Sequence, residues 1–158
     1  MSDDPVVIPP RRPFSGTRSR GPLVLVVDPD DVTRDVYAAE LAGAGFMVLE
    51  ADGGAAAIEK ALQFGPHALL LDLMLPEVDG YKVARRLRTD DRTRDVAIVA
   101  LTGLPSGNAK EIATAAGCDA VFTKPVEPFV LVAELVRLIA KRTREARAPD
   151  LSRLLRGR

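Results

Sequence analysis

Four residues that can bind a metal ion or a phosphoryl group stand directly after short apolar runs of the sequence. They are Asp28 after LVLVV, Asp72 after HALLL, Thr102 after VAIVAL and Lys124 after AVFT. Clustered carboxylates repel one another unless a cation neutralises them, and oxygen ligands suit a hard ion such as Mg²⁺. An aspartate beside such an ion can attack phosphorus, while a hydroxyl and an ammonium group can bind phosphoryl oxygens. The four residue types therefore suit phosphoryl chemistry on an aspartate.

The apolar runs predict the strands of a parallel sheet that is buried on both faces, because each run is short and is followed by a helical pattern. Five strands alternating with five helices predict one doubly wound α/β domain with helices on both faces. The carboxyl ends of parallel strands meet at one edge, so the four residues should converge there. The expected strands are 23–28, 46–51, 67–72, 96–101 and 120–123; the expected helices are 31–44, 52–64 with Asp52 as cap, 81–88, 106–116 and 125–147.

The ordered set of motifs resembles the receiver domain of two-component response regulators, a flavodoxin-like fold, over about residues 22–140. The segment LLLDLMLPEVDG, with Asp72, Pro76 and Gly80, is similar to the phosphoacceptor loop of that family. The segments ALTG and FTKP also fall at the family's intervals. The resemblance implies that Asp72 accepts a phosphoryl group from a phosphohistidine on a sensor histidine kinase or phosphotransfer protein.

The resemblance also implies roles for the neighbouring residues. Mg²⁺ would be held by Asp28, Asp72 and the backbone carbonyl of Met74. The phosphoryl group would be met by Thr102, with Gly103 leaving room for it, and would pair with Lys124. Pro125 is a candidate for a cis peptide bond, for which proline has the lowest cost. Met74 and Leu104 flank the site in the family, and because both side chains are apolar we expect slow self-dephosphorylation.

The sequence departs from the family pattern in two places. The family normally has two adjacent acids after the first strand, whereas this chain has Asp28-Pro29, so we expect retained but weakened Mg²⁺ binding; Asp30 or Asp31 could substitute if the loop bends inward. Val121 also stands where many receivers have Tyr or Phe. Phe122, the next residue, should face the core on the opposite side of the strand.

Two other functions are compatible with parts of the sequence. The chain could be a pseudo-receiver that acts as a binding module without phosphorylation, since Pro29 removes one metal ligand. VVDPDDV also resembles the first motif of haloacid-dehalogenase-type phosphohydrolases, with Asp28 as nucleophile and Asp30 as acid/base. The second alternative leaves Asp72 and the LPEVDG loop unexplained. We expect a signalling protein and not an enzyme.

The net charge of zero conceals an acidic body between basic ends. Residues 1–22 hold four basic and two acidic residues, and residues 141–158 hold seven basic and two acidic residues. Of the 22 acids, 18 therefore lie between these ends. The only cysteine, Cys118, excludes an intramolecular disulfide framework. The first residues have neither a basic region nor an apolar core, so we expect no export by a signal peptide, and no apolar run reaches membrane length. We expect a cytoplasmic location.

We divide the 158 residues into a disordered proline-rich basic arm (1–22), the receiver (23–140) and a basic C-terminal helical extension or tail (141–158). This leaves too little chain for an output domain. The output should therefore be contact with a downstream protein, and neither nucleic acid nor a membrane is expected as the partner. A homodimer through the last helices remains open. For His67 and Cys118 we expect structural roles.

Overall fold

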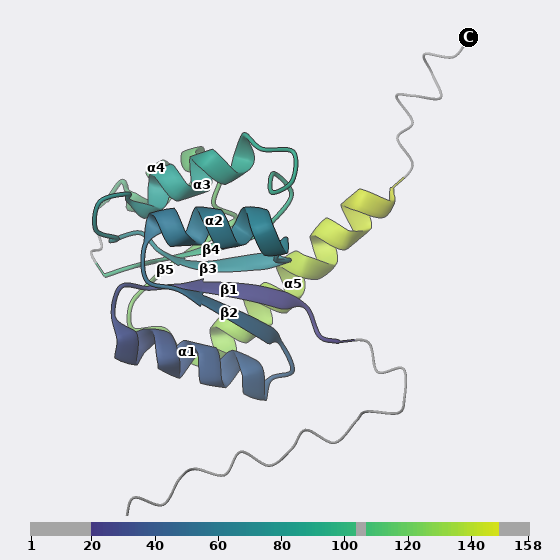
Figure 1. The fold of residues 1–158 in the computed structure, drawn as a ribbon, viewed down its shortest axis with the longest axis horizontal. Helices are drawn as coiled ribbons and strands as arrows, with labels where there is room; N and C mark the ends of the chain where they lie inside the picture. The colour runs from purple at the N-terminus through teal and green to yellow at the C-terminus, as the bar shows by residue number, and fades with distance from the viewer. Residues whose placement is uncertain (1–19, 104–106, 149–158) are drawn as a thin grey trace, which may run out of the picture.

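The computed structural model describes residues 20–103 and 107–148. Their strands form one parallel sheet in the order β2-β1-β3-β4-β5 (Figure 1). This arrangement confirms the predicted doubly wound, flavodoxin-like fold. The strands are β1 (Leu23–Val27), β2 (Met47–Ala51), β3 (Ala68–Asp72), β4 (Ala97–Thr102) and β5 (Ala120–Thr123).

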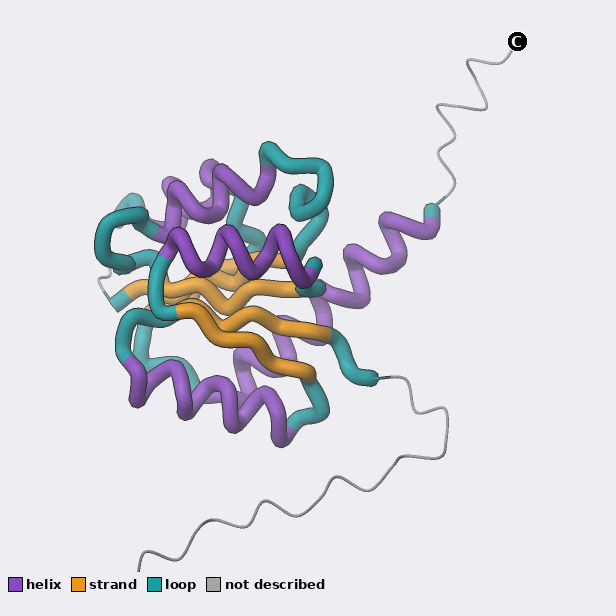
Figure 2. The backbone as a smooth tube through the Cα atoms, in the orientation of Figure 1, coloured by secondary structure: helices purple, strands orange, loops and turns teal. Residues whose placement is uncertain are grey.

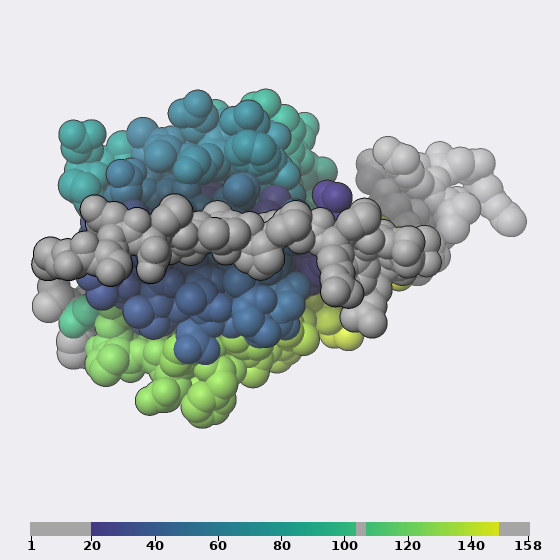
Figure 3. All heavy atoms as spheres, turned by 60° about the horizontal axis from the view of Figure 1, so that its bottom comes forward, coloured from purple at the N-terminus to yellow at the C-terminus, as the bar shows by residue number. Residues whose placement is uncertain are grey.

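Helices cover both faces of the sheet, and Figure 2 shows them in two layers with the strands between. Helices α1 and α5 pack side by side on one face, as the space-filling view in Figure 3 also shows. Helices α2, α3 and α4 cover the other face. The helices are α1 (Asp31–Gly43), α2 (Gly54–Phe64), α3 (Gly80–Arg88), α4 (Ala109–Ala116) and α5 (Pro128–Arg147).

The central strands are continuous apolar runs because successive side chains enter two different cores. Leu25, Leu69 and Ile98 pack under α2, α3 and α4, whereas Leu70 and Val99 pack under α1 and α5. All five residues are buried. Because helices cover both faces of the sheet, neither side of these strands reaches water, and the runs contain no alternating polar residues.

Several helix ends follow local signals in the sequence. The Asp30 side chain accepts a hydrogen bond from the Thr33 amide at the start of α1, and Gly65 ends α2 in the left-handed region at φ 57°. The prediction that Asp52 caps α2 is wrong. The cap residue is Gly53 and makes no side-chain cap bond, because the helix begins at Gly54 and leaves Asp52 one residue outside the cap position.

The last helix crosses the predicted domain boundary at residue 140 without interruption. It ends at Arg147, so the first part of the basic extension is helical, and Figure 1 shows this part of α5 extending past the sheet. Predictions for residues 1–19, for Leu104 and for residues 149–158 lie outside the described residues. Within the described ranges, no helix is both long and apolar enough to cross a membrane.

Candidate functional site

The four residues predicted to do chemistry are assembled at the carboxyl edge of the sheet. Asp28 follows β1, Asp72 ends β3, Thr102 ends β4 and Lys124 follows β5, and these four strands are consecutive neighbours in the sheet. Asp28, Asp72 and Thr102 are only 2%, 5% and 5% exposed. They are three of the four buried polar residues in the described part of the chain. Because charged groups are rarely buried without partners, this edge needs a counter-charge.

Lys124 supplies that counter-charge to both carboxylates. Its Nζ donates hydrogen bonds to Oδ2 of Asp28 at 2.7 Å and to Oδ2 of Asp72 at 2.6 Å. Burial lowers the pKa of the lysine, but the hydrogen bonds to the two carboxylates and their negative charges together place the pKa above its ordinary value. The ammonium group is therefore charged at neutral pH. Two carboxylates sharing one ammonium leave a net negative charge that favours a further cation.

Backbone amides bind the remaining carboxylate oxygens and fix both side chains. Oδ1 of Asp28 accepts a hydrogen bond from the Asp30 amide at 2.8 Å, and Oδ1 of Asp72 accepts one from the Met74 amide at 2.7 Å. Each carboxylate thus has one oxygen held by the loop that follows it and one held by Lys124. This geometry orients both groups without a bound ligand.

The loop after β3 returns very close to Asp72. The Gly80 amide donates to the Leu73 carbonyl at 3.1 Å. A Cβ atom on Gly80 would lie 2.6 Å from both the Asp72 carbonyl oxygen and the Leu73 Cα. Only glycine therefore fits at this position, which explains one member of the sequence motif that carries Asp72.

We expect Gly80→Ala to lower the free energy of unfolding by about 1–3 kcal/mol, because the clash is with backbone that cannot move without displacing Asp72. Urea unfolding at neutral pH measures the loss. Gly43→Ala is the matched control, since it lies in α1 with no atom within 4 Å of its added Cβ, and it should be neutral or slightly stabilising. Equal midpoints for the two variants would contradict the prediction.

The loop after β1 does not bring a third acid into the cluster. Asp30 accepts hydrogen bonds from the Thr33 amide at 3.0 Å and from the Thr33 hydroxyl at 2.5 Å, and these bonds hold the pKa of Asp30 below its ordinary value. Asp31 forms an ion pair with Arg34. Both carboxylates are thus engaged in capping and pairing α1, and the substitution of Asp30 or Asp31 for the ligand missing at Pro29 stays a prediction.

The residues present still fit a hydrated Mg²⁺ ion. Within residues 20–103 and 107–148, no group of three or more acidic, histidine or cysteine side chains is placed to hold a metal. Mg²⁺, however, commonly binds one or two carboxylates and keeps several waters or phosphate oxygens. Asp28 and Asp72, both within hydrogen-bond distance of Lys124, supply two such carboxylates at one edge of the sheet.

Sequence reasoning missed Arg34 as a support of the site. Its Nη1 donates to the Asp28 carbonyl at 2.8 Å, so α1 holds the end of β1 from outside the carboxylate cluster. The only local signal is a basic residue in the first turns of a helix, which is too common to be diagnostic.

Two expectations based on the last strand agree with the structure. The Lys124–Pro125 peptide bond is cis. Val121 packs against the core under α2, α3 and α4, while Phe122 packs against the opposite core. Lys124 is held beside Thr102 by a 2.8 Å bond from its amide to the Thr102 carbonyl.

The profile of the response regulator receiver domain matches residues 24–136. The chain belongs to this family. The receiver is 34% identical over 134 residues to the DNA-binding dual master transcriptional regulator RpaA of Synechocystis sp. (85% of this chain, 56% of the relative). It is 36% identical over 123 residues to the phosphate regulon regulatory protein PhoB of Pseudomonas aeruginosa (78% and 53%). The chain therefore spans about half the length of these curated relatives.

Solved receiver structures have the same fold. The receiver domain of the sensor histidine kinase PA1611 from Pseudomonas aeruginosa, with a magnesium ion coordinated in its active-site cleft, is 31% identical with a TM-score of 0.71. The alignment covers 76% of this chain and 98% of that one. The chemotaxis protein CheY4 of Vibrio cholerae is 26% identical with a TM-score of 0.71, over 75% and 98% of the two chains. Receiver domains are signalling modules of two-component systems.

Proposed function

We propose that this receiver accepts a phosphoryl group on Asp72 from a phosphohistidine of a sensor histidine kinase or phosphotransfer protein, and signals by protein contacts. The observation that carries the proposal is the position of Asp72, which is buried at the end of β3, bonded to Lys124 and adjacent to Asp28. A structural aspartate would need one counter-ion. Two buried carboxylates that share one ammonium group are better explained by a site that binds a metal ion and a phosphoryl group.

The proposed transfer makes one bond and breaks one. An Asp72 carboxylate oxygen attacks phosphorus, the P–N bond of the phosphohistidine breaks, and the leaving imidazole takes a proton. The Lys124 ammonium, now 2.6 Å from Oδ2 of Asp72, is placed to bind a phosphoryl oxygen on the same carboxylate. In this proposal the hydroxyl of Thr102, the last residue of the neighbouring strand β4, binds a second phosphoryl oxygen.

We propose that Asp28, Asp72 and the Met74 carbonyl hold Mg²⁺. When bound, the ion supplies positive charge that stabilises the phosphoryl oxygens. Pro29 offers no side-chain ligand, so the affinity should be weaker than in receivers with two adjacent acids. The magnesium ion named for the PA1611 receiver supports the assignment of this edge as the metal site.

The deciding experiment is incubation with acetyl phosphate and Mg²⁺, followed by intact mass. We expect the wild-type chain to gain one phosphoryl group and Asp72→Asn to gain none, because the amide cannot attack phosphorus. Asp52→Asn, an exposed acid outside the cluster, is the matched control and should be phosphorylated normally.

The same measurement distinguishes the alternatives. An unmodified wild-type chain at millimolar Mg²⁺ would support the pseudo-receiver, and hydrolysis of a phosphomonoester that needs Asp28 but not Asp72 would support the phosphohydrolase. The rate at which the phosphorylated species disappears from the mass spectrum tests the prediction of slow self-dephosphorylation, which rests on the apolar side chain of Met74. We expect a half-life of minutes or longer, and a half-life of seconds would contradict slow self-dephosphorylation.

Exposed apolar side chains beside the site support transfer from a protein donor. Val32 in the first turn of α1 and Phe129 in the first turn of α5 are each 72% exposed. Both turns begin at the carboxyl edge that holds Asp72. Apolar groups left in water at such a position favour a protein partner over a small-molecule donor.

A further inference from the structure

An apolar groove lies at the opposite edge of the sheet from Asp72. Its volume is about 330 Å³, within the range of pockets that bind ligands. It lies where β1 and β2 begin, between the turn after α1 and the second half of α5. Val136 in its wall is 54% exposed. The lining residues carry no charged or hydrogen-bonding side chain; they are Pro22, Ala44, Gly45, Phe46, Val136, Ile139 and Ala140.

The N-terminal part of the chain enters the fold through the wall of this groove. A Cβ on Gly21 would lie 1.9 Å from the Gly45 carbonyl oxygen, so the two backbones touch. The Met47 amide donates to the Pro22 carbonyl at 2.9 Å. These contacts fix residues 21–22 against the groove, and every preceding residue is tethered to that point.

From this placement we infer that the groove binds the segment Val6–Ile8 of the same chain. This segment, VVI, is the main apolar run of residues 1–19 and is followed by two prolines. Thirteen residues separate Ile8 from Pro22, and at about 3.3 Å per residue they can span roughly 40 Å. Tethering also gives the segment an effective concentration on the order of millimolar, so a weak apolar contact is sufficient.

The chemistry of the groove favours this segment over the other chain end. The groove wall has no acid to pair with a cation, and VVI has no charge. The leucines of the C-terminal segment, by contrast, stand among arginines in LSRLLRGR. Helix α5, which precedes that segment in the chain, extends past the edge of the sheet before it ends at Arg147 (Figure 1). The inference does not depend on phosphorylation of Asp72.

A nitroxide label near the segment tests the contact in the full chain. Ser2→Cys provides the labelling position; the native Cys118 is buried, and burial raises the pKa of its thiol to about 11. In ¹⁵N-labelled protein we expect the amide signals of Gly45, Phe46 and Ala140 to broaden. Signals at the carboxyl edge, such as Met74, should be unaffected.

The control is the same labelled chain with Val6→Ser, Val7→Ser and Ile8→Ser, in which the selective broadening should fall several-fold. Absent or uniform broadening, or equal broadening in this variant, would overturn the inference. Broadening in a mixture of spin-labelled ¹⁴N chain and unlabelled ¹⁵N chain would assign the groove to a second copy. Selective broadening of Gly45, Phe46 and Ala140 by a label at Ser152→Cys would assign the groove to the C-terminal segment. Binding of a second copy or of the C-terminal segment would each overturn the inference.

Discussion

Replacing Lys124 with alanine is expected to lower the free energy of unfolding by about 2–3 kcal/mol at neutral pH. The variant leaves the carboxylates of Asp28 and Asp72 buried together without a counter-ion, and breaking a buried ion pair on one side commonly costs about 3–5 kcal/mol. We expect the lower figure because the lysine side chain is 23% exposed, so water can reach the vacated position. Urea or thermal unfolding measures the loss.

The pH dependence of the stability loss shows whether the missing charge of Lys124 causes it. The pKa of Lys124 is raised in the folded state, so its stabilising effect is complete below the unfolded pKa of about 10.4 and is lost as the pH rises above it. The difference in stability between the variant and the wild type should therefore shrink at a pH above the pKa of the lysine, where the wild type also lacks the charge. Millimolar Mg²⁺ should stabilise the variant more than the wild type, since the ion replaces the missing cation.

The control is Lys82→Ala, which removes an exposed lysine of α3 and should change the free energy of unfolding by less than about 0.5 kcal/mol. The explanation is wrong if Lys124→Ala is as stable as this control at neutral pH. It is also wrong if the stability deficit of the variant is unchanged at a pH above the pKa of Lys124, because a lost packing contact would not titrate.

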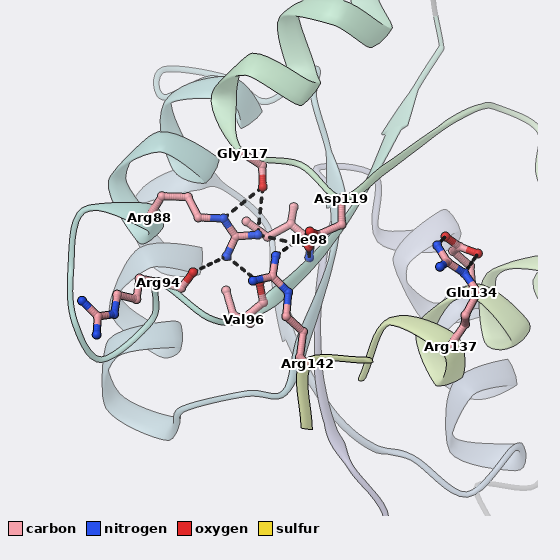
Figure 4. A network of polar contacts seen from close by, with 9 residues as sticks. All are labelled: Arg88, Arg94, Val96, Ile98, Gly117, Asp119, Glu134, Arg137 and Arg142. Atoms are coloured by element: carbon pink, nitrogen blue, oxygen red, sulfur yellow. Dashed lines mark hydrogen bonds and ion pairs between the residues drawn. The ribbon is translucent and has the colours of Figure 1, made fainter. Parts of the chain in front are cut away.

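Arg88→Ala should destabilise the receiver by about 3 kcal/mol, with a fall in Tm of about 10 °C. Figure 4 shows its guanidinium group inside a polar network at the other end of the sheet. The group donates to the carbonyls of Gly117, at 3.0 and 2.8 Å, and of Arg94, at 2.8 Å. It also binds the Val96 carbonyl and Oδ2 of Asp119. Alanine removes this donor from the carbonyls of Gly117, Arg94 and Val96, whereas Asp119 keeps its bonds to the Ile98 amide and to Arg142.

The planar, forked shape of arginine is essential to this network. Arg88→Lys keeps the charge but cannot reach the same carbonyls at once, so it should recover less than half of the lost stability. Arg85→Ala, an exposed neighbour on α3, is the matched control and should be within about 0.5 kcal/mol of wild type. Full rescue by lysine would show that the charge, and not the set of hydrogen bonds, stabilises this end of the fold.

Asp119 links this network to the last helix. Its Oδ2 accepts a hydrogen bond from the Ile98 amide at 2.8 Å in addition to the bond from Arg88, and its Oδ1 accepts one from Arg142 of α5. One carboxylate therefore ties the beginnings of β4 and β5 to α3 and to the basic part of α5. Because its partners come from separate elements, removing Asp119 and Arg88 together should give less than the sum of the two single effects.

The sequence alone determined the sheet and the residues at its carboxyl edge. Buried parallel strands leave continuous apolar runs, and the alternation of strands with helices requires every strand to end on the same side. Asp28, Asp72, Thr102 and Lys124 could therefore be placed together from their positions after those runs. The resemblance to receivers supplied the roles proposed for them, and the cis bond before Pro125 was expected from the same motif.

Only the tertiary structure decided how the loops use their polar groups. Asp30 could have turned toward Asp28, but capping the first turn of α1 engages its carboxylate with Thr33. Asp52 looked like a cap, but α2 begins too late for it. The bond from Arg88 to Gly117 joins residues 29 apart, for which the sequence has no local signal. Apolar periodicity is a property of neighbouring residues, whereas hydrogen-bond partners depend on where distant backbone segments meet in space.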